Sequence, residues 1–187
     1  MLRRSMIGVL AGAAVLTLPL TAGVAAPAAA ATALATTITF DDSQAAEFKS
    51  AVAQGVEVWN TSVKNVQLVR ATPGARVNIR ILADNGWPRA TLGPVRPSGS
   101  VTVWMGRQAV QQGHNVIRIA AHELGHSLGL PDVKPGPCSS LMSGSSAGTS
   151  CTNPKPNAQE AARVEQNYRT GANEQHPDSG VLISDAA

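Results

Sequence analysis

Two histidines and a glutamate within residues 120–132 have the spacing of a catalytic metal site. His122, Glu123 and His126 form the pattern His-Glu-x-x-His. On an α-helix, residues four positions apart share a face, so both imidazoles can reach one metal ion. Glu123 projects about 100° round the helix from His122, close enough to hold a water beside the metal. Two neutral imidazoles plus one more ligand leave a fourth tetrahedral position open, which is the arrangement of a catalytic zinc ion.

Asp132 is the nearest candidate for the third ligand. Gly129 suits a helix end in the left-handed conformation, where a Cβ atom would cost energy, so the chain can turn sharply back. Pro131 cannot continue the helix and helps to direct the chain out of it. The alternative ligands are Glu160 and Glu165, which lie on a later predicted helix. A site that used either of them would belong to a different class of zinc protease.

The helix that carries the histidines is expected to begin after Asn115, because asparagine is a good N-cap residue. Apolar residues at helical spacing form a stripe roughly opposite His122 and His126. The stripe consists of Ile117, Ala120, Ala121, Leu124 and Leu128. We therefore expect one face of this helix to pack into the core while the histidine face looks into a cleft.

The motif His-Glu-x-x-His-x-x-Gly-x-x-Asp, followed by Leu-Met-Ser-Gly at residues 141–144, resembles the metzincin clan of zinc proteases. Within that clan, the aspartate ligand, the small size and the run Pro-Cys-Ser-Ser-Leu-Met-Ser-Gly resemble the snapalysin family, small neutral proteases secreted by streptomycetes. The resemblance covers about residues 36 to 168. It implies that Met142 forms the Met-turn, a tight turn whose side chain lies beneath the zinc ligands.

The same resemblance carries two expectations about the substrate. It implies that the strand before the active-site helix is an antiparallel edge that binds an extended substrate through main-chain hydrogen bonds. From its sequence alone, that strand could equally be central. The resemblance also implies cleavage on the amino side of large aromatic residues.

Lys134 departs from the family pattern, in which a tyrosine follows two residues after the aspartate ligand. That tyrosine is thought to assist near the zinc. Lysine at this position removes neither a metal ligand nor the general base. The absence of the tyrosine concerns the rate of hydrolysis and the details of its mechanism.

The N-terminus reads as a signal peptide covering residues 1–31. Arg3 and Arg4 precede a charge-free apolar run at residues 7–20, and small residues with several possible cleavage sites follow at 24–31. A retained membrane anchor is the alternative. With the signal removed, the formal net charge falls from +3 to about +1, and no basic cluster remains that would indicate nucleic-acid binding. We expect a secreted protein with no stable membrane association.

The remaining chain is long enough for one domain with one core, placed at residues 32–170. The pattern predicts an α+β fold, with a mixed twisted sheet of about four to five strands and three helices. Asn157 with Glu160 resembles a capping box for the last helix. Residues 84–99 are predicted to form a long loop and 171–187 a flexible tail. The predicted strands cover residues 36–40, 66–70, 76–83 and 100–105, and the first helix ends near residue 60.

Cys138 and Cys151 are the only cysteines, and in an exported chain a pair is expected to form a disulfide. The bridge would close a loop of about 14 residues that contains Met142, worth roughly 3 kcal/mol in the chain-entropy description. It could firm the wall beside the zinc where the substrate side chain after the scissile bond enters. It could equally be a simple staple on a surface loop.

These features predict a monomeric zinc metalloendopeptidase that acts on proteins and peptides, with Glu123 as the general base. One zinc ion is the expected cofactor; calcium binding is supported by no motif. Two alternatives are a secreted zinc-binding protein with impaired catalysis, for which Lys134 is the only support, and a disulfide-stapled inhibitor or adhesion domain with a coincidental motif.

Overall fold

The computed structural model describes residues 34–169 and 179–185. The predicted signal peptide lies outside the described residues. None of the helices within the described ranges combines the length and the apolar character that crossing a bilayer requires. The described residues all belong to one compact unit, and everything below concerns that unit.

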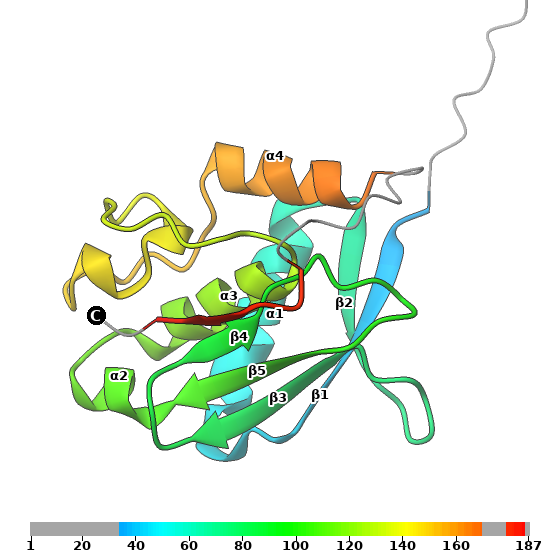
Figure 1. The fold of residues 1–187 in the computed structure, drawn as a ribbon, viewed down its shortest axis with the longest axis horizontal. Coiled ribbons are helices and arrows are strands. Elements are labelled where there is room, and N and C mark those ends of the chain that lie inside the picture. Colours follow the sequence, from blue (N-terminus) through cyan, green and yellow to red (C-terminus); the bar gives the residue numbers. More distant parts are fainter. Residues whose placement is uncertain (1–33, 170–178, 186–187) are drawn as a thin grey trace, which may run out of the picture. The chain divides into compact units, whose positions relative to one another are not determined.

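A mixed sheet of six strands forms one layer of the domain, with the strand order β2-β1-β3-β5-β4-β6 (Figure 1). The pairs β1–β2, β1–β3 and β3–β5 are parallel, whereas β4 is antiparallel to both β5 and β6. The prediction of an α+β domain with a mixed sheet is therefore confirmed. The strands are β1 (Thr36–Gln44), β2 (Val66–Arg70), β3 (Ile79–Asp84), β4 (Arg89–Thr91), β5 (Val101–Gly106) and β6 (Leu182–Ser184).

Alternating apolar residues bury one face of the sheet. Ile38 and Phe40 in β1 and Ile79 and Ile81 in β3 are almost fully buried, and the intervening residues are more exposed. Helices α1 (Lys49–Ser62) and α3 (Val116–Ser127) lie together behind the sheet in Figure 1. The two helices are joined by a buried hydrogen bond of 2.8 Å from the Trp59 indole to a backbone oxygen of α3. This packing fixes the position of α3 against the sheet.

Local signals placed the starts of α3 and α4 (Ala158–Asn167) correctly, whereas α1 begins at Lys49, after the expected caps at residues 41–43, which lie in β1. The Asn115 side chain accepts hydrogen bonds from two backbone N–H groups in the first turn of α3, and Asn157 and Glu160 form a capping box at the start of α4. The remaining helical segments are short. They are α2 (Arg107–Gln111) and the 3-10 helices η1 (Ala46–Phe48) and η2 (Leu141–Ala147).

The expectation that the strand before the active-site helix is a sheet edge is wrong. That strand is β5, which lies between β3 and β4 in the sheet. Its antiparallel neighbour β4 comes from the segment predicted to be a long loop. The three residues of β4, Arg89–Thr91, are too few to show strand periodicity, so only pairing with neighbouring strands defines this strand.

The prediction of a flexible tail at residues 171–187 is wrong for 179–185. Leu182–Ser184 form β6, which pairs with β4 and supplies the outermost strand on this side of the sheet. Residues 170–178 and 186–187 lie outside the described residues. A strand of three residues gains its stability from its partner, which the sequence alone does not identify.

Candidate metal centre

Helix α3 and the loop after it bring His122, His126 and Asp132 together. The Asp132 Oδ1 atom lies 3.3 Å from His122 Nε2 and 3.5 Å from His126 Nε2. With metal–ligand bonds of about 2 Å, tetrahedral geometry places two ligand atoms about 3.3 Å apart. The Asp132 oxygen therefore lies at a suitable separation from each imidazole nitrogen for one zinc ion, and the three ligand atoms all lie within 4.8 Å of one another.

Backbone carbonyl groups orient both imidazoles. His122 Nδ1 lies 3.0 Å from the Leu141 oxygen, and His126 Nδ1 lies 2.7 Å from the Leu130 oxygen. A carbonyl can only accept, so each Nδ1 carries the proton and each Nε2 keeps a free lone pair. Such partners hold a metal-binding histidine in the correct tautomer and ring orientation. Sequence reasoning could not find them, because the partner atoms are main-chain oxygens.

Unpartnered buried polar atoms gather in this site. Across the described parts of the chain, six buried side-chain nitrogen or oxygen atoms have no hydrogen-bond partner, and five of them belong to His122, Glu123, His126 and Asp132. Burying a polar atom without a partner costs about 1–3 kcal/mol. Three of the five belong to His122, His126 and Asp132, whose ligand atoms lie within 4.8 Å of one another, and two imidazoles with one carboxylate are a donor set that fits zinc.

The electrostatics of the site also favour a cation. Burial alone would lower the pKa of His122, but the carboxylates of Asp132, Glu123 and Asp185 outweigh it and raise that pKa to about 9. Burial raises the pKa of Glu123 to about 8, and the negative charges of Asp185 and Asp132 add to this effect. A cavity that draws protons onto these groups attracts a metal cation for the same reason.

Gly129 turns the chain back toward the histidines. Its φ of +94° confirms the predicted left-handed conformation. A Cβ atom at this position would lie 2.7 Å from the Asn167 amide nitrogen and 2.8 Å from Pro94. The turn is closed by the Leu130 N–H, which donates to the Gly125 oxygen at 3.0 Å. Asp132 follows directly and reaches the two imidazoles.

Met142 packs against α3 between the two histidines. A Cβ atom placed on Gly125 would lie 2.8 Å from the Met142 sulfur, so only glycine lets the helix approach this side chain so closely. Met142 is 1% exposed. Its backbone belongs to the segment whose Leu141 oxygen orients His122. The Met-turn role that the resemblance implied for this residue stays a prediction.

Glu160 and Glu165, the alternative ligands, are engaged elsewhere. The Glu160 carboxylate accepts hydrogen bonds from the N–H groups of Leu141 and Met142, at 3.1 and 2.9 Å. Glu165 accepts from the N–H groups of residues 64 and 65. Neither glutamate belongs to a group of potential ligands in the described residues. Glu160 instead holds the segment that carries Met142.

Cys138 and Cys151 form the predicted disulfide, with their Cα atoms 5.5 Å apart. The bridge encloses η2 and its buried Met142, so it restrains the segment that orients His122.

Replacing both cysteines by serine is expected to lower the free energy of unfolding by about 3 kcal/mol, because the closed loop contains about 14 residues. Denaturant unfolding of the oxidised parent and the double variant measures this. Chemical reduction of the parent serves as the control and should give the same loss. A change below about 1 kcal/mol would contradict a stabilising role for the bridge.

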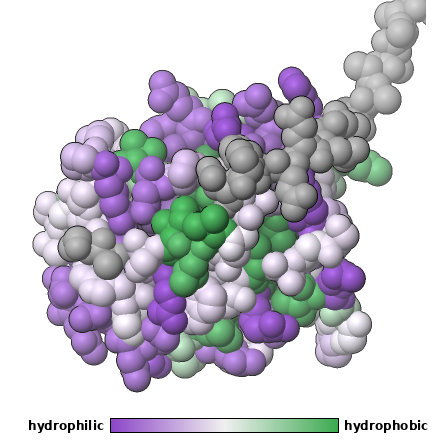
Figure 2. All heavy atoms as spheres, viewed as in Figure 1, coloured by the Kyte–Doolittle hydropathy of each residue, from purple (hydrophilic) through white to green (hydrophobic). Residues whose placement is uncertain are grey.

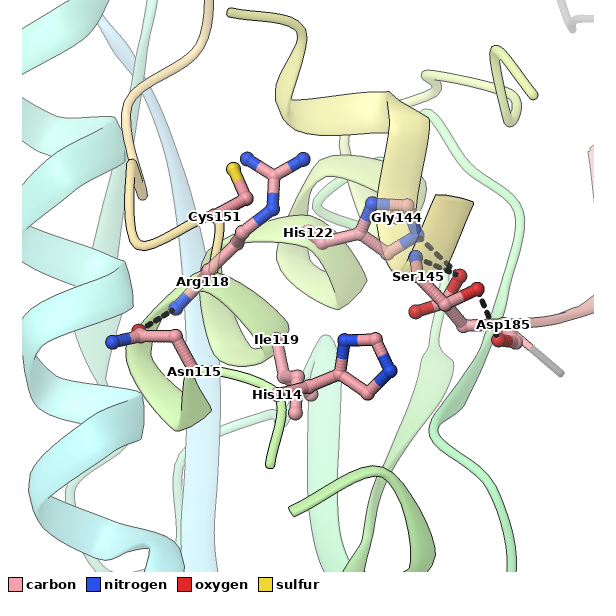
Figure 3. Close-up of a pocket in the computed structure, with 9 residues that line it drawn as sticks. All are labelled: His114, Asn115, Arg118, Ile119, His122, Gly144, Ser145, Cys151 and Asp185. Carbon is pink, nitrogen blue, oxygen red and sulfur yellow. Dashed lines mark hydrogen bonds and ion pairs between the residues drawn. The ribbon is translucent and has the colours of Figure 1, made fainter. Parts of the chain in front are cut away.

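A small hollow of about 10 Å³, room for about one water molecule, lies beside His122. Figure 3 shows Asn115, Arg118 and Ile119 from the start of α3 on one side and Gly144 and Ser145 on the other. Other residues that line the hollow are His114, Cys151 and Asp185. The pocket therefore lies between the active-site helix and the disulfide-closed loop.

Asp185 is a residue of this region that sequence reasoning missed. Its side chain is 3% exposed, and its Oδ1 atom lies 3.9 Å from His122 Nε2. It pairs with Lys134, whose Nζ atom also lies 3.4 Å from Asp132 Oδ2. His122, Glu123 and Asp185 form a second group of potential metal ligands. No local pattern near residue 185 signals this placement.

Comparison with known proteins assigns the chain to a family. Residues 35–171 match the Streptomyces extracellular neutral proteinase (M7) family. An extracellular small neutral protease of Streptomyces caespitosus is 42% identical over 135 residues, which are 72% of this chain and 98% of that protein. A protein of the same description from Streptomyces coelicolor is 40% identical over 74% of this chain, but only 62% of its own length is covered.

Among solved structures, the hatching enzyme HCE-1, a zinc protease of medaka fish, matches 51% of this chain and 44% of its own. The TM-score is 0.38 with 20% identity, so this likeness carries no argument. The family match and the curated relatives are sufficient by themselves. The chain belongs to the Streptomyces extracellular neutral proteinase (M7) family of zinc metalloendopeptidases.

Proposed function

We propose that this chain is a secreted endopeptidase whose zinc ion is held by His122, His126 and Asp132, with Glu123 as the general base. The observation that carries the proposal is the group of five unpartnered buried polar atoms on these four residues. Secretion is supported by the apolar N-terminal segment and by relatives described as extracellular.

Zinc at this position would lower the pKa of a bound water and polarise the scissile carbonyl. The chain's own residues supply the proton transfers. Glu123 follows His122 directly, and its carboxylate oxygens have no hydrogen-bond partner in the described residues. It accepts the proton of the attacking water and delivers it to the departing amine. The raised pKa of Glu123 reflects burial, and a cation beside the carboxylate acts against that rise.

We further propose that β4 binds the extended substrate. It is antiparallel to the otherwise parallel part of the sheet, and the backbone after it approaches α3, where the Gly93 N–H donates to the His126 oxygen at 2.8 Å. A peptide paired with β4 would run past the imidazole rings of His122 and His126. Backbone pairing of this kind supplies affinity without dependence on sequence.

The hollow beside His122 is proposed to receive the side chain that follows the scissile bond. Its walls come from α3 and from Gly144 and Ser145, and the disulfide at Cys151 closes its far side. At about 10 Å³ the hollow would have to widen to hold a large aromatic side chain, so that preference rests on the family resemblance.

Hydrolysis of casein and of a matched peptide series by the zinc-loaded protein tests this function. Peptides with phenylalanine or tyrosine after the scissile bond should be cleaved at least about tenfold faster than the alanine peptide, because burial of an aromatic side chain contributes about 1.5–3 kcal/mol. Equal rates across the series would contradict the assignment of the pocket. Absence of hydrolysis of any protein substrate would contradict the proposed function.

A further inference from the structure

Segment 179–185 lies along the outer side of β4, where the proposed function places the substrate. Residues 182, 183 and 184 pair with Thr91, Ala90 and Arg89 in antiparallel register. Further backbone bonds extend the pairing: the Leu92 N–H donates to the Val181 oxygen at 2.7 Å, and the Asp185 N–H donates to the Pro88 oxygen at 3.0 Å. The outer backbone groups of β4 are therefore already in use.

The segment ends in the metal centre. Asp185 is buried beside His122, and its Oδ1 atom accepts a hydrogen bond from the Ser145 N–H at 3.2 Å. Asp185 also lines the hollow assigned to the substrate side chain (Figure 3). The segment thus spans the β4 edge and reaches the catalytic centre, as a bound peptide would.

Lys134 explains why an aspartate is stable at this place. Asp185 brings a third carboxylate next to those of Glu123 and Asp132, and close like charges repel. The Lys134 ammonium pairs with Asp185 and also faces Asp132. The lysine that departs from the family's tyrosine therefore has a specific partner in this chain.

The rest of the segment is held weakly. Val181 and Leu182 are each 54% exposed, and Figure 2 shows a hydrophobic patch over β6. Few apolar side chains of the segment are buried, so its attachment depends on the backbone pairing with β4 and on Asp185. An attachment of this kind can be displaced by a competing peptide.

We propose that segment 179–185 is a built-in inhibitor that occupies the edge of β4 where substrate would bind. In this arrangement Asp185 lies at the catalytic centre and forms an ion pair with Lys134. The proposal rests on the peptidase function proposed above. It predicts that the full chain hydrolyses peptides slowly until the segment leaves β4. A tethered segment competes with substrate at an effective concentration in the millimolar range.

The first test compares the full chain with Asp185→Asn and with Ile183→Pro, which removes a backbone donor opposite Ala90. The value of kcat/KM for a short peptide should rise by about tenfold or more in both variants, through the loss of a competitor at millimolar effective concentration. Ser184→Ala is the matched control, because Ser184 is exposed and its change should leave kcat/KM as in the parent. Equal kcat/KM in the parent and both variants would overturn the proposal.

The second test does not depend on activity. Hydrogen exchange of the Leu92 amide, which donates to Val181, is followed in the zinc-free and zinc-loaded full chain. Exchange should be about tenfold or more faster in Ile183→Pro than in the parent, and unchanged in Ser184→Ala. Equal exchange in the parent and Ile183→Pro would overturn the docking of the segment.

A synthetic peptide of residues 179–187 supplies the third test. Added to the Ile183→Pro variant, it should inhibit competitively, and the same peptide with asparagine in place of Asp185 should inhibit about tenfold more weakly. Absence of inhibition would contradict the proposal. If every variant is inactive while the Leu92 amide is protected in the parent and in Ser184→Ala but not in Ile183→Pro, the docked segment stands and the peptidase function fails. The two failures are therefore distinguishable.

Discussion

Glu123→Gln is expected to reduce casein hydrolysis by about a thousandfold while the zinc content of the protein stays at one ion per chain. General acid–base catalysis by a positioned side chain contributes about 10²- to 10⁴-fold. Glutamine has nearly the same shape as glutamate but accepts no proton from the attacking water. Because zinc is assigned to His122, His126 and Asp132, the metal should remain. Initial rates and metal analysis on the same samples measure both quantities.

The matched control is Glu57→Gln, a glutamate on the exposed face of α1, which should leave both quantities unchanged. If Glu123→Gln kept more than about a tenth of the parent rate, the assignment of Glu123 as the base would be wrong. If the variant lost zinc together with activity, Glu123 would instead be a ligand of the zinc ion.

Asp132→Ala is expected to weaken zinc binding by more than about a hundredfold, with activity falling in parallel. Loss of a hydrogen-bond partner of a metal ligand typically costs 10- to 100-fold in affinity, and loss of the ligand itself costs more. Removal of Asp132 also takes away a negative charge, 3.3 and 3.5 Å from the two Nε2 atoms, that would neutralise part of the charge of the bound cation. Competition with a chromogenic chelator gives the affinity directly.

Glu165→Ala is the control for the competing ligand assignment. The Glu165 carboxylate accepts two backbone hydrogen bonds, at 2.6 and 2.8 Å, from residues 64 and 65. Its removal should lower stability by about 1.5–3 kcal/mol and leave zinc affinity unchanged, because hydrogen bonds to a charged group contribute this much. If zinc affinity fell in Glu165→Ala and not in Asp132→Ala, the third ligand would have been misassigned.

Short-range patterns in the sequence determined much of the centre. The spacing of His122, Glu123 and His126 places them on adjoining faces of one helix wherever that helix lies in the fold. Asn115 and Gly129 define its two ends through local hydrogen bonding and backbone conformation, and the structure confirms both. The two cysteines, as the only pair, could bridge only each other. Each inference depends on neighbours in the chain or on simple counting. The metal and base roles of these residues remain predictions.

Only the tertiary structure decided which distant groups meet the centre. Leu130 and Leu141 orient the imidazoles through backbone oxygens, which every residue possesses and no sequence pattern marks. Glu160 was a reasonable ligand by residue type, and its capping-box position at the start of α4 was predicted. Its further engagement with the Met142 segment became visible only when that segment folded against α4.

The prediction from the sequence and the structure differ most at β4, β6 and Asp185. Strands of three residues carry no periodicity that sequence analysis can detect, and they exist because a partner strand binds them. In the sequence, Lys134 departs from the family pattern, which has a tyrosine there, and no neighbouring residue explains the change. Its reason is a carboxylate that lies 51 positions along the chain, brought next to it when β6 pairs with β4. The sequence thus predicted which residues form the centre, and the fold decided which distant residues lie beside it, because strand pairing joins residues that no local rule connects.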